Sequence, residues 1–183
     1  PNVPHSGVVA KNIGYINLTV FTQDAARNIS EAFRDLKNKN PEMKGLILDL
    51  RENGGGLLNE AVEIINLFVP RGEVAVSMRG KVPEWDQVFK TMQTPVDTEM
   101  PVVILVNKHS ASASEVVSGG LQDLDRAVVM GQRTYGKGLV QNTRELGYNA
   151  RIKLTTAKYY TPSGRCIQSV RFKNGEPVDI PES

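Results

Sequence analysis

Three serines lie within five residues, at Ser110, Ser112 and Ser114, and they are the first candidates for chemistry in this chain. They follow a short apolar run, 102–106, and precede a run whose apolar residues recur at helical spacing. We therefore expect them at a connection between a strand and a helix, where backbone N–H groups without a helical partner can stabilise an oxyanion. A serine at that place acts either as a nucleophile or only as a cap of the helix, which is a common position for serine.

A nucleophilic serine needs a base, and the two histidines are poor candidates. His5 lies in the first ten residues, and His109 is adjacent to the cluster, where neighbouring residues on a turn rarely face each other. Lysine can replace histidine when it is desolvated, because its unperturbed pKa of about 10.4 must fall before it accepts a proton near neutrality. Lys137 is a good candidate, since Gly136 and Gly138 flank it and admit a close approach of backbone. The alternative is an ordinary solvated lysine.

Two glycine-rich stretches bear on this chemistry. Residues 131–137 match the first seven places of a phosphate-binding P-loop, but Gly138 occupies the place of the magnesium-binding hydroxyl and the next run favours a strand. We therefore expect no nucleotide. The second stretch, Gly54–Gly56, lies between a predicted strand and a predicted helix. It is either a tight turn or the source of a backbone amide for an anion or a developing oxyanion.

Other chemistries find no support in the residue types. No metal-binding motif occurs, and we expect neither a metal nor another cofactor. Carboxylates such as Glu60, Glu63 and Glu115 are interpreted as solvated faces, and the single cysteine, Cys166, as a packing or surface residue. The net charge of +2 and the lack of a basic stripe do not indicate nucleic acid. No apolar run approaches the roughly 18 residues of a membrane span.

The elements that must position these groups alternate between strands and helices. Apolar runs predict strands over 13–20, 45–50, 73–78, 102–106 and 126–130. Helical spacing predicts one helix over 25–36, with capping candidates at 22–24, and a second helix over 57–68. A third helix is predicted after the serine cluster and ends at Asp123. A hairpin over 139–160 with its turn at 147–149 follows. We expect a layered α/β fold with added β-hairpins, in one domain over 11–170, with a linker or frayed terminus over 1–10 and a tail over 171–183.

Taken together, these stretches resemble the carboxyl-terminal processing peptidases, also called tail-specific proteases, which are serine peptidases with a Ser-Lys active site. The matching runs, in the order of the family, are 13–16, 48–58, 106–115, 119–123, 134–141 and 158–168. No single run is specific, but together they cover nearly all of residues 13–168. The resemblance implies a Clp protease/crotonase-like α/β fold, with 11–170 as the peptidase catalytic core.

Carried over by position, the resemblance implies a role for each residue of a site. Ser112 is then the nucleophile, Lys137 the general base, and Gln141 the side chain that orients the lysine. The backbone amides of Ala113 and Gly56 are the implied oxyanion hole.

Four further positions are implied with less defined roles. Gly55 is a further possible position beside the oxyanion hole. Asp123 matches a position linked to activity in some members of the family, and the alternative is that it only caps a helix or forms a structural pair. Ser110 and Ser114 are then framework hydroxyls, which we expect to cap the helix.

The resemblance also implies partners and a compartment. The substrates would be proteins or peptides with unstructured C-termini, which bind as an added strand and are cleaved through an acyl-enzyme. The full-length chain is expected to carry a PDZ domain and to allow a homo-oligomer, and its compartment is expected to be extracytoplasmic, in the periplasm or cell envelope. Two features depart from the family: nothing in residues 1–183 resembles a PDZ domain, and Gly54 stands where proline is common. A catalytically silent module on the same fold, which binds peptides or apolar ligands, is the alternative.

Overall fold

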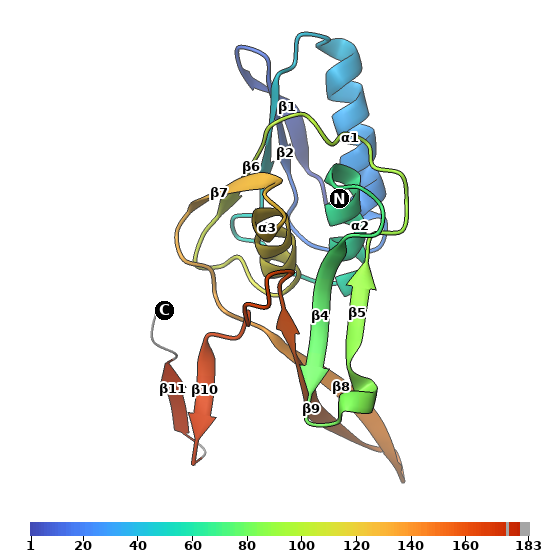
Figure 1. Ribbon diagram of the computed structural model, residues 1–183, viewed down its shortest axis with the longest axis vertical. Coiled ribbons are helices and arrows are strands. Elements are labelled where there is room, and N and C mark those ends of the chain that lie inside the picture. Colours follow the sequence, from blue (N-terminus) through green and yellow to red (C-terminus); the bar gives the residue numbers. More distant parts are fainter. Residues whose placement is uncertain (175, 180–183) are drawn as a thin grey trace.

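The computed structural model describes residues 1–174 and 176–179, and its first half alternates strands with helices (Figure 1). In chain order the elements are β1 (His5–Ala10), β2 (Ile13–Asn17), α1 (Ala25–Lys39), β3 (Gly45–Asp49), α2 (Leu58–Phe68), β4 (Val74–Gly80), the 3-10 turn η1 (Pro83–Trp85), β5 (Gln87–Lys90), β6 (Val102–Val106), α3 (Ala113–Asp123), β7 (Ala127–Gly131), β8 (Leu139–Gly147), β9 (Ala150–Tyr160), β10 (Val170–Lys173) and β11 (Glu176–Asp179). This order confirms the predicted α/β class with added hairpins.

The main sheet has the order β1-β2-β3-β6-β7, and all its neighbouring strands are parallel except β1 and β2. Along β6, Val102, Ile104 and Val106 are buried, while Val103 and Leu105 are partly exposed. The run predicted as a buried parallel strand is therefore covered mainly on one face. This alternation fits a sheet covered by the helices on one side, where α1 packs on α2 and α2 packs on α3.

Parallel pairing brings the glycine run and the serine cluster to the same end of the sheet, where β3 and β6 finish. Asp49 at the end of β3 lies opposite Leu105 near the end of β6. The glycine run that follows β3 and the serine cluster that follows β6 therefore leave the sheet side by side.

Helix α1 begins without a side-chain cap of its own. Asp24 precedes it with a left-handed backbone, φ 66°, and makes no capping hydrogen bond. Glu60 of α2 serves instead, since its carboxylate accepts the N–H groups of Asp24 at 3.0 Å and Ala26 at 2.9 Å. The caps predicted at 22–24 and the solvated Glu60 are thus both wrong, because a buried carboxylate 34 residues from Ala26 replaces the local cap.

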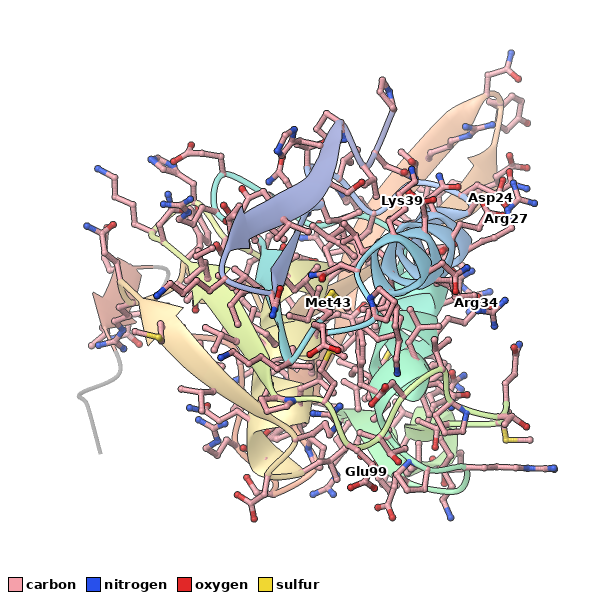
Figure 2. All side chains as sticks on the ribbon, turned by 90° about the horizontal axis from the view of Figure 1, so that it is seen from above. Asp24, Arg27, Arg34, Lys39, Met43 and Glu99 are labelled. Atoms are coloured by element: carbon pink, nitrogen blue, oxygen red, sulfur yellow. The ribbon has the colours of Figure 1, made fainter. Side chains whose placement is uncertain are left out.

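The exposed side of α1 is strongly charged. Figure 2, seen from above, shows Arg27 and Arg34 projecting away from the body of the molecule. Arg27 pairs with Asp24 at 3.3 Å across one turn. The opposite side of the helix buries Ile29 and Phe33, as its apolar spacing predicts.

A second sheet, of order β5-β4-β9-β8, extends below the main sheet in Figure 1. The hairpin of β8 and β9 turns at Tyr148 and Asn149, both with positive φ, as predicted. Its outer half is exposed on both faces, as the run of exposed residues from Gln141 to Thr155 indicates. Lys137 lies just before β8, so the foot of this hairpin belongs to the candidate site.

The two ends of the chain differ from their predicted disorder. Residues 5–10 form β1, which pairs with β2, because the alternating residues from Ile13 onward offer an edge on which a strand can pair. The tail predicted over 171–183 contains most of β10 and β11, which form a separate two-stranded sheet. Residues 175 and 180–183 lie outside the described residues. In the part of the chain that is described, no helix is long and apolar enough to cross a membrane.

Candidate active site

Ser112 stands at the junction between the serine cluster and α3, immediately before the first residue of the helix. Its backbone has φ 58° and ψ −114°, a region that non-glycine residues rarely adopt and that costs about 1–3 kcal/mol. Ser112 is half-buried, whereas Ala111 and Ala113 on either side are buried. The hydroxyl-bearing residue is therefore held on a strained turn at the start of a helix, where the Ala113 amide is available to an oxyanion.

The two flanking serines hold this turn to the segment after β3. Ser110 Oγ donates to the Leu50 carbonyl at 2.8 Å, and Ser114 Oγ donates to the Asn53 carbonyl at 2.8 Å. Both serines are fully buried. Their contacts are those of framework hydroxyls, but the expectation that they cap the helix is wrong, because both hydroxyls donate to the segment after β3.

Asn53 organises the glycine run and was missed by sequence reasoning. Its side chain is completely buried, donates to the Leu18 carbonyl at 2.8 Å and accepts the Gly55 N–H at 2.9 Å. Its own carbonyl accepts the Ala111 N–H at 3.0 Å. No local pattern marks such a residue, because its partners come from three separate segments.

Gly55 and Gly56 approach their neighbours so closely that a side chain would not fit. A Cβ on Gly55, where φ is 100°, would lie 2.8 Å from the Ser112 Cβ and 3.0 Å from the Ala113 nitrogen. A Cβ on Gly56, where φ is 147°, would lie 2.3 Å from the Phe21 carbonyl oxygen. Gly55 thus lies directly against Ser112, but its N–H already donates to Asn53. The Gly56 amide is the remaining candidate donor from this run.

The start of this run is fixed by an ion pair between the buried Asp49 carboxylate and the partly exposed Arg51 side chain. The Asp49 side chain, 3% exposed, accepts Arg51 Nη2 at 2.6 Å and the Tyr15 hydroxyl at 2.7 Å. Burial alone would raise the pKa of Asp49, but the hydrogen bonds from Arg51 and Tyr15 outweigh it and lower the pKa. The carboxylate therefore stays charged and holds the chain where β3 ends.

Glu115 connects the serine turn to the loop that carries Lys137. Its Oε2 accepts the N–H of Ser112 at 2.8 Å and of Lys137 at 2.9 Å, and its Oε1 accepts the Gly136 N–H at 2.5 Å. Glu115 is 5% exposed, so its interpretation as a solvated residue is wrong. One signal could have found it: glutamate three residues after a serine at a helix start is the spacing of a capping box.

The side chains of Lys137 and Gln141 are less enclosed than their backbones. Both residues are exposed. Within the described part of the chain, no hydrogen bond joins the side chains of Lys137 and Ser112. Gln141 lies in β8 opposite Thr155, beside an irregularity in the pairing. The structure therefore brings the backbone of Lys137 to Ser112 through Glu115, but leaves the ammonium group in contact with solvent.

Asp123 lies at the opposite end of α3, eleven residues after Ser112 and thus about 16 Å away along the helix. Its carboxylate accepts the N–H of Ser163 at 3.0 Å and the Ser163 hydroxyl at 2.6 Å, and it pairs with Arg165. Burial would raise the pKa of Asp123, but hydrogen bonds from Ser163, Thr161 and Arg165 outweigh it and lower the pKa. The structure does not bring Asp123 to Ser112, and its contacts join α3 to the turn after β9.

The remaining candidates lie outside this arrangement. His109 is exposed, and its N–H donates to the Asn107 side chain at 3.1 Å. The P-loop-like stretch is followed by strand β8, where a phosphate site needs a helix. Among residues 1–174 and 176–179, no group of three or more His, Cys, Asp or Glu side chains is arranged to hold a metal ion.

Comparison with known proteins agrees with the geometry. Residues 12–176 match peptidase family S41. The chain is 42% identical over 175 residues to a carboxy-terminal-processing protease of Bartonella bacilliformis, and 36% identical over 171 residues to a carboxyl-terminal-processing protease of Synechocystis. These matches take in 94% and 93% of this chain, but only 40% and 39% of the relatives.

A solved structure supports the same relationship. The photosystem II D1 C-terminal processing protease superposes with a TM-score of 0.78 at 32% identity, over 91% of this chain and 41% of that protein. The chain therefore spans about two fifths of the length of the relatives it matches.

Proposed function

Because the chain belongs to peptidase family S41, we propose that it is the catalytic core of a serine endopeptidase that cleaves proteins near their C-termini, with Ser112 as nucleophile and Lys137 as general base. The observation that carries this proposal is the bridge made by Glu115. It fixes the backbone of Ser112 and the backbone of Lys137 to the same carboxylate.

The proposed reaction proceeds through an acyl-enzyme. The neutral Lys137 amine takes the proton from Ser112 Oγ as that oxygen attacks the scissile carbonyl carbon. The Ala113 and Gly56 N–H groups stabilise the oxyanion of the tetrahedral intermediate. When this intermediate collapses, the C–N bond breaks and the lysine returns the proton to the leaving amine. Water then attacks the ester, activated by the same lysine, and releases Ser112.

A lysine base must be largely dehydrated to work near neutral pH, and Lys137 is exposed. We propose that the bound substrate, or a part of the full-length protein beyond residues 1–183, covers the ammonium group in the working enzyme. Gln141, four residues further along, would then hold the lysine amine toward Ser112.

The substrates and partners are proposed on the family relationship. Unstructured C-terminal segments of proteins would bind as an added strand, and a PDZ domain in the full-length chain would recognise them. A homo-oligomer and an extracytoplasmic compartment, periplasm or cell envelope, complete the proposal. Fractionation of cells that express the full-length protein tests the compartment, and recovery in the cytoplasmic fraction contradicts it.

Alanine variants of the full-length protein test the proposed roles directly. Ser112→Ala and Lys137→Ala should each lower kcat for an unstructured peptide by roughly 1,000-fold or more, because each removes one member of the dyad. Lys153→Ala is the matched control, since Lys153 is an exposed lysine on β9 remote from Ser112, and it should keep full activity. Near-normal turnover by Lys137→Ala would show that the base is another group.

The exposure of Lys137 favours one alternative, a silent module that binds peptides without cleaving them. This alternative predicts that the full-length protein binds an unstructured peptide and leaves it intact. Mass spectrometry of the peptide after long incubation separates the two functions, because cleavage products that are missing with Ser112→Ala exclude the silent module.

A further inference from the structure

The loop that carries Lys137 is held on a second side by a segment without a role in the proposed mechanism. After β9 the chain reverses, and Thr161 N–H donates to the Arg165 carbonyl at 2.9 Å. The returning segment runs along the end of β9, where Ile167 N–H donates to the Tyr159 carbonyl at 3.1 Å. This reversal brings Gln168, which is only 7% exposed, against the Lys137 loop.

Three side-chain oxygens, two from Glu115 and one from Gln168, accept the N–H groups of three consecutive residues. Gln168 Oε1 accepts the Gly138 N–H at 2.8 Å. The preceding two N–H groups, of Gly136 and Lys137, donate to the two oxygens of Glu115. The backbone on both sides of the Lys137 Cα is therefore fixed from two separate elements, α3 and the segment after β9.

The glycines beside Lys137 fit this contact. A Cβ on Gly138 would lie 2.3 Å from the backbone nitrogen of Gln168. A Cβ on Gly136, where φ is 85°, would lie 1.9 Å from Ser169 Oγ. Ser169 N–H also donates to the Gly136 carbonyl at 3.1 Å. The sequence Gly-Lys-Gly thus allows the returning segment to pack directly on the loop.

Side chains do not fill the space around this contact. A cavity of about 720 Å³ lies between α3, the loop and the returning segment, and Glu115, Gly136 and Gln168 are among the residues that line it. This cavity borders the loop on one side only, so the hydrogen bonds and the close contacts of Gly136 and Gly138 together define the place of the loop.

We propose that Gln168 is a positioning residue for the reaction: by holding the Gly138 amide it fixes the backbone from which the Lys137 side chain reaches Ser112. This inference rests on the proposed function of Lys137. Gln168 acts through the loop backbone and touches neither the substrate nor the reacting atoms in this account.

The test uses the full-length protein and replaces Gln168 by residues of similar size. Gln168→Met removes the acceptor and keeps the volume, and it should lower kcat about 10- to 100-fold, with KM changed less than about threefold, because a small displacement of a reacting group costs that much. Gln168→Glu keeps an oxygen acceptor but adds a buried carboxylate near that of Glu115, so it should keep more of the wild-type kcat than Gln168→Met without reaching it. If Gln168→Met does not fold, Gln168→Asn, which withdraws the amide by one methylene, should show the same loss.

Asn66→Leu is the matched control. Asn66 is 6% exposed, and its Oδ1 also accepts loop amides, those of Met92 at 2.9 Å and Gln93 at 2.7 Å, which belong to a loop other than the one that carries Lys137. This variant should lose stability and keep wild-type kcat per folded molecule. Amide hydrogen exchange of residues 134–138 should rise in Gln168→Met and remain unchanged in Asn66→Leu.

Three results overturn the inference: wild-type kcat in Gln168→Met, an equal loss of kcat in Gln168→Glu, or an equal loss in Asn66→Leu. Lys137→Ala is measured in parallel, because it shows whether only the role of Gln168 is wrong or the proposed function as well. If Lys137→Ala is inactive while Gln168→Met is fully active, only the role of Gln168 is wrong. If Lys137→Ala is active, the proposed function itself fails.

Discussion

At the scale of single residues, Ser112 is a nucleophile candidate held in an unfavourable conformation by its surroundings. Its positive φ costs about 1–3 kcal/mol. Hydrogen bonds from Ser110 and Ser114 to the segment after β3, and from the Ser112 amide to Glu115, offset this cost. A strained turn of this kind keeps the Ala113 amide beside the Ser112 hydroxyl group.

Glu115 should be as important for activity as it is for stability. Glu115→Ala leaves three N–H groups without their acceptor, and each buried unsatisfied donor costs about 1–3 kcal/mol. We expect the free energy of unfolding of the full-length protein to fall by about 3 kcal/mol or more. We expect kcat to fall by roughly 100-fold, since both members of the dyad lose their common anchor.

Urea denaturation and steady-state kinetics measure these two effects. Glu115→Gln keeps one carbonyl oxygen as an acceptor and should lose less of each. Glu63→Ala, which removes an exposed glutamate of α2, serves as the control and should match the wild type. Full activity of a folded Glu115→Ala variant would contradict the role of the bridge.

At the scale of elements, α3 is fastened at both of its ends. Its N-terminus is tied to the glycine run and to the Lys137 loop, while Asp123 at its C-terminus is tied to Ser163 and Arg165. The returning segment after β9 therefore contacts α3 at one end and the Lys137 loop at the other. A shift of this segment would affect both the C-terminal end of α3 and the Lys137 loop.

The lowered pKa of Asp123 predicts how stability depends on pH. A carboxyl whose pKa is lower in the folded state stabilises that state above its ordinary pKa of about 3.8, and this contribution is lost as the pH falls through the folded pKa. Asp123→Asn should cost about 1–3 kcal/mol at pH 7, the usual loss for a hydrogen-bonded charged group. The difference from wild type should be constant above about pH 5 and should shrink in more acidic solution.

Denaturation at several pH values checks this dependence, and kinetics at pH 7 decide between a structural and a catalytic role. Because Asp123 is about 16 Å from Ser112 along α3, kcat should change less than about threefold. A kcat lowered 10-fold or more in a folded Asp123→Asn protein would support the catalytic role that the family resemblance implies.

At the scale of the whole molecule, the sequence predicted the parts that depend on local patterns. Apolar runs and helical spacing identified β3, β6, α1 and α2, and the turn at Tyr148 and Asn149 identified the long hairpin. The ordered motifs identified the family. For the elements, the signal lies within about fifteen residues and reflects the period of the element, whereas the family signal is spread over residues 13–168.

The parts that the sequence did not predict depend on contacts between distant segments. Glu60 and Glu115 are charged residues on helices, where the usual position is solvated, and only the fold shows that each accepts buried amides. Asn53 and Gln168 likewise have partners 30 or more residues away. The exposure of Lys137 could not be predicted either, because burial of a loop side chain depends on what the rest of the molecule places over it.

The most direct test of the Ser112–Lys137 dyad is the rate at which a fluorophosphonate labels the full-length protein, with the labelled residue identified by peptide mapping. Wild type should be labelled on Ser112 alone, and Lys137→Ala should be labelled at least about 100-fold more slowly because the hydroxyl has lost its base. Labelling of Ser110 or Ser114, or an unchanged rate in Lys137→Ala, would contradict the dyad.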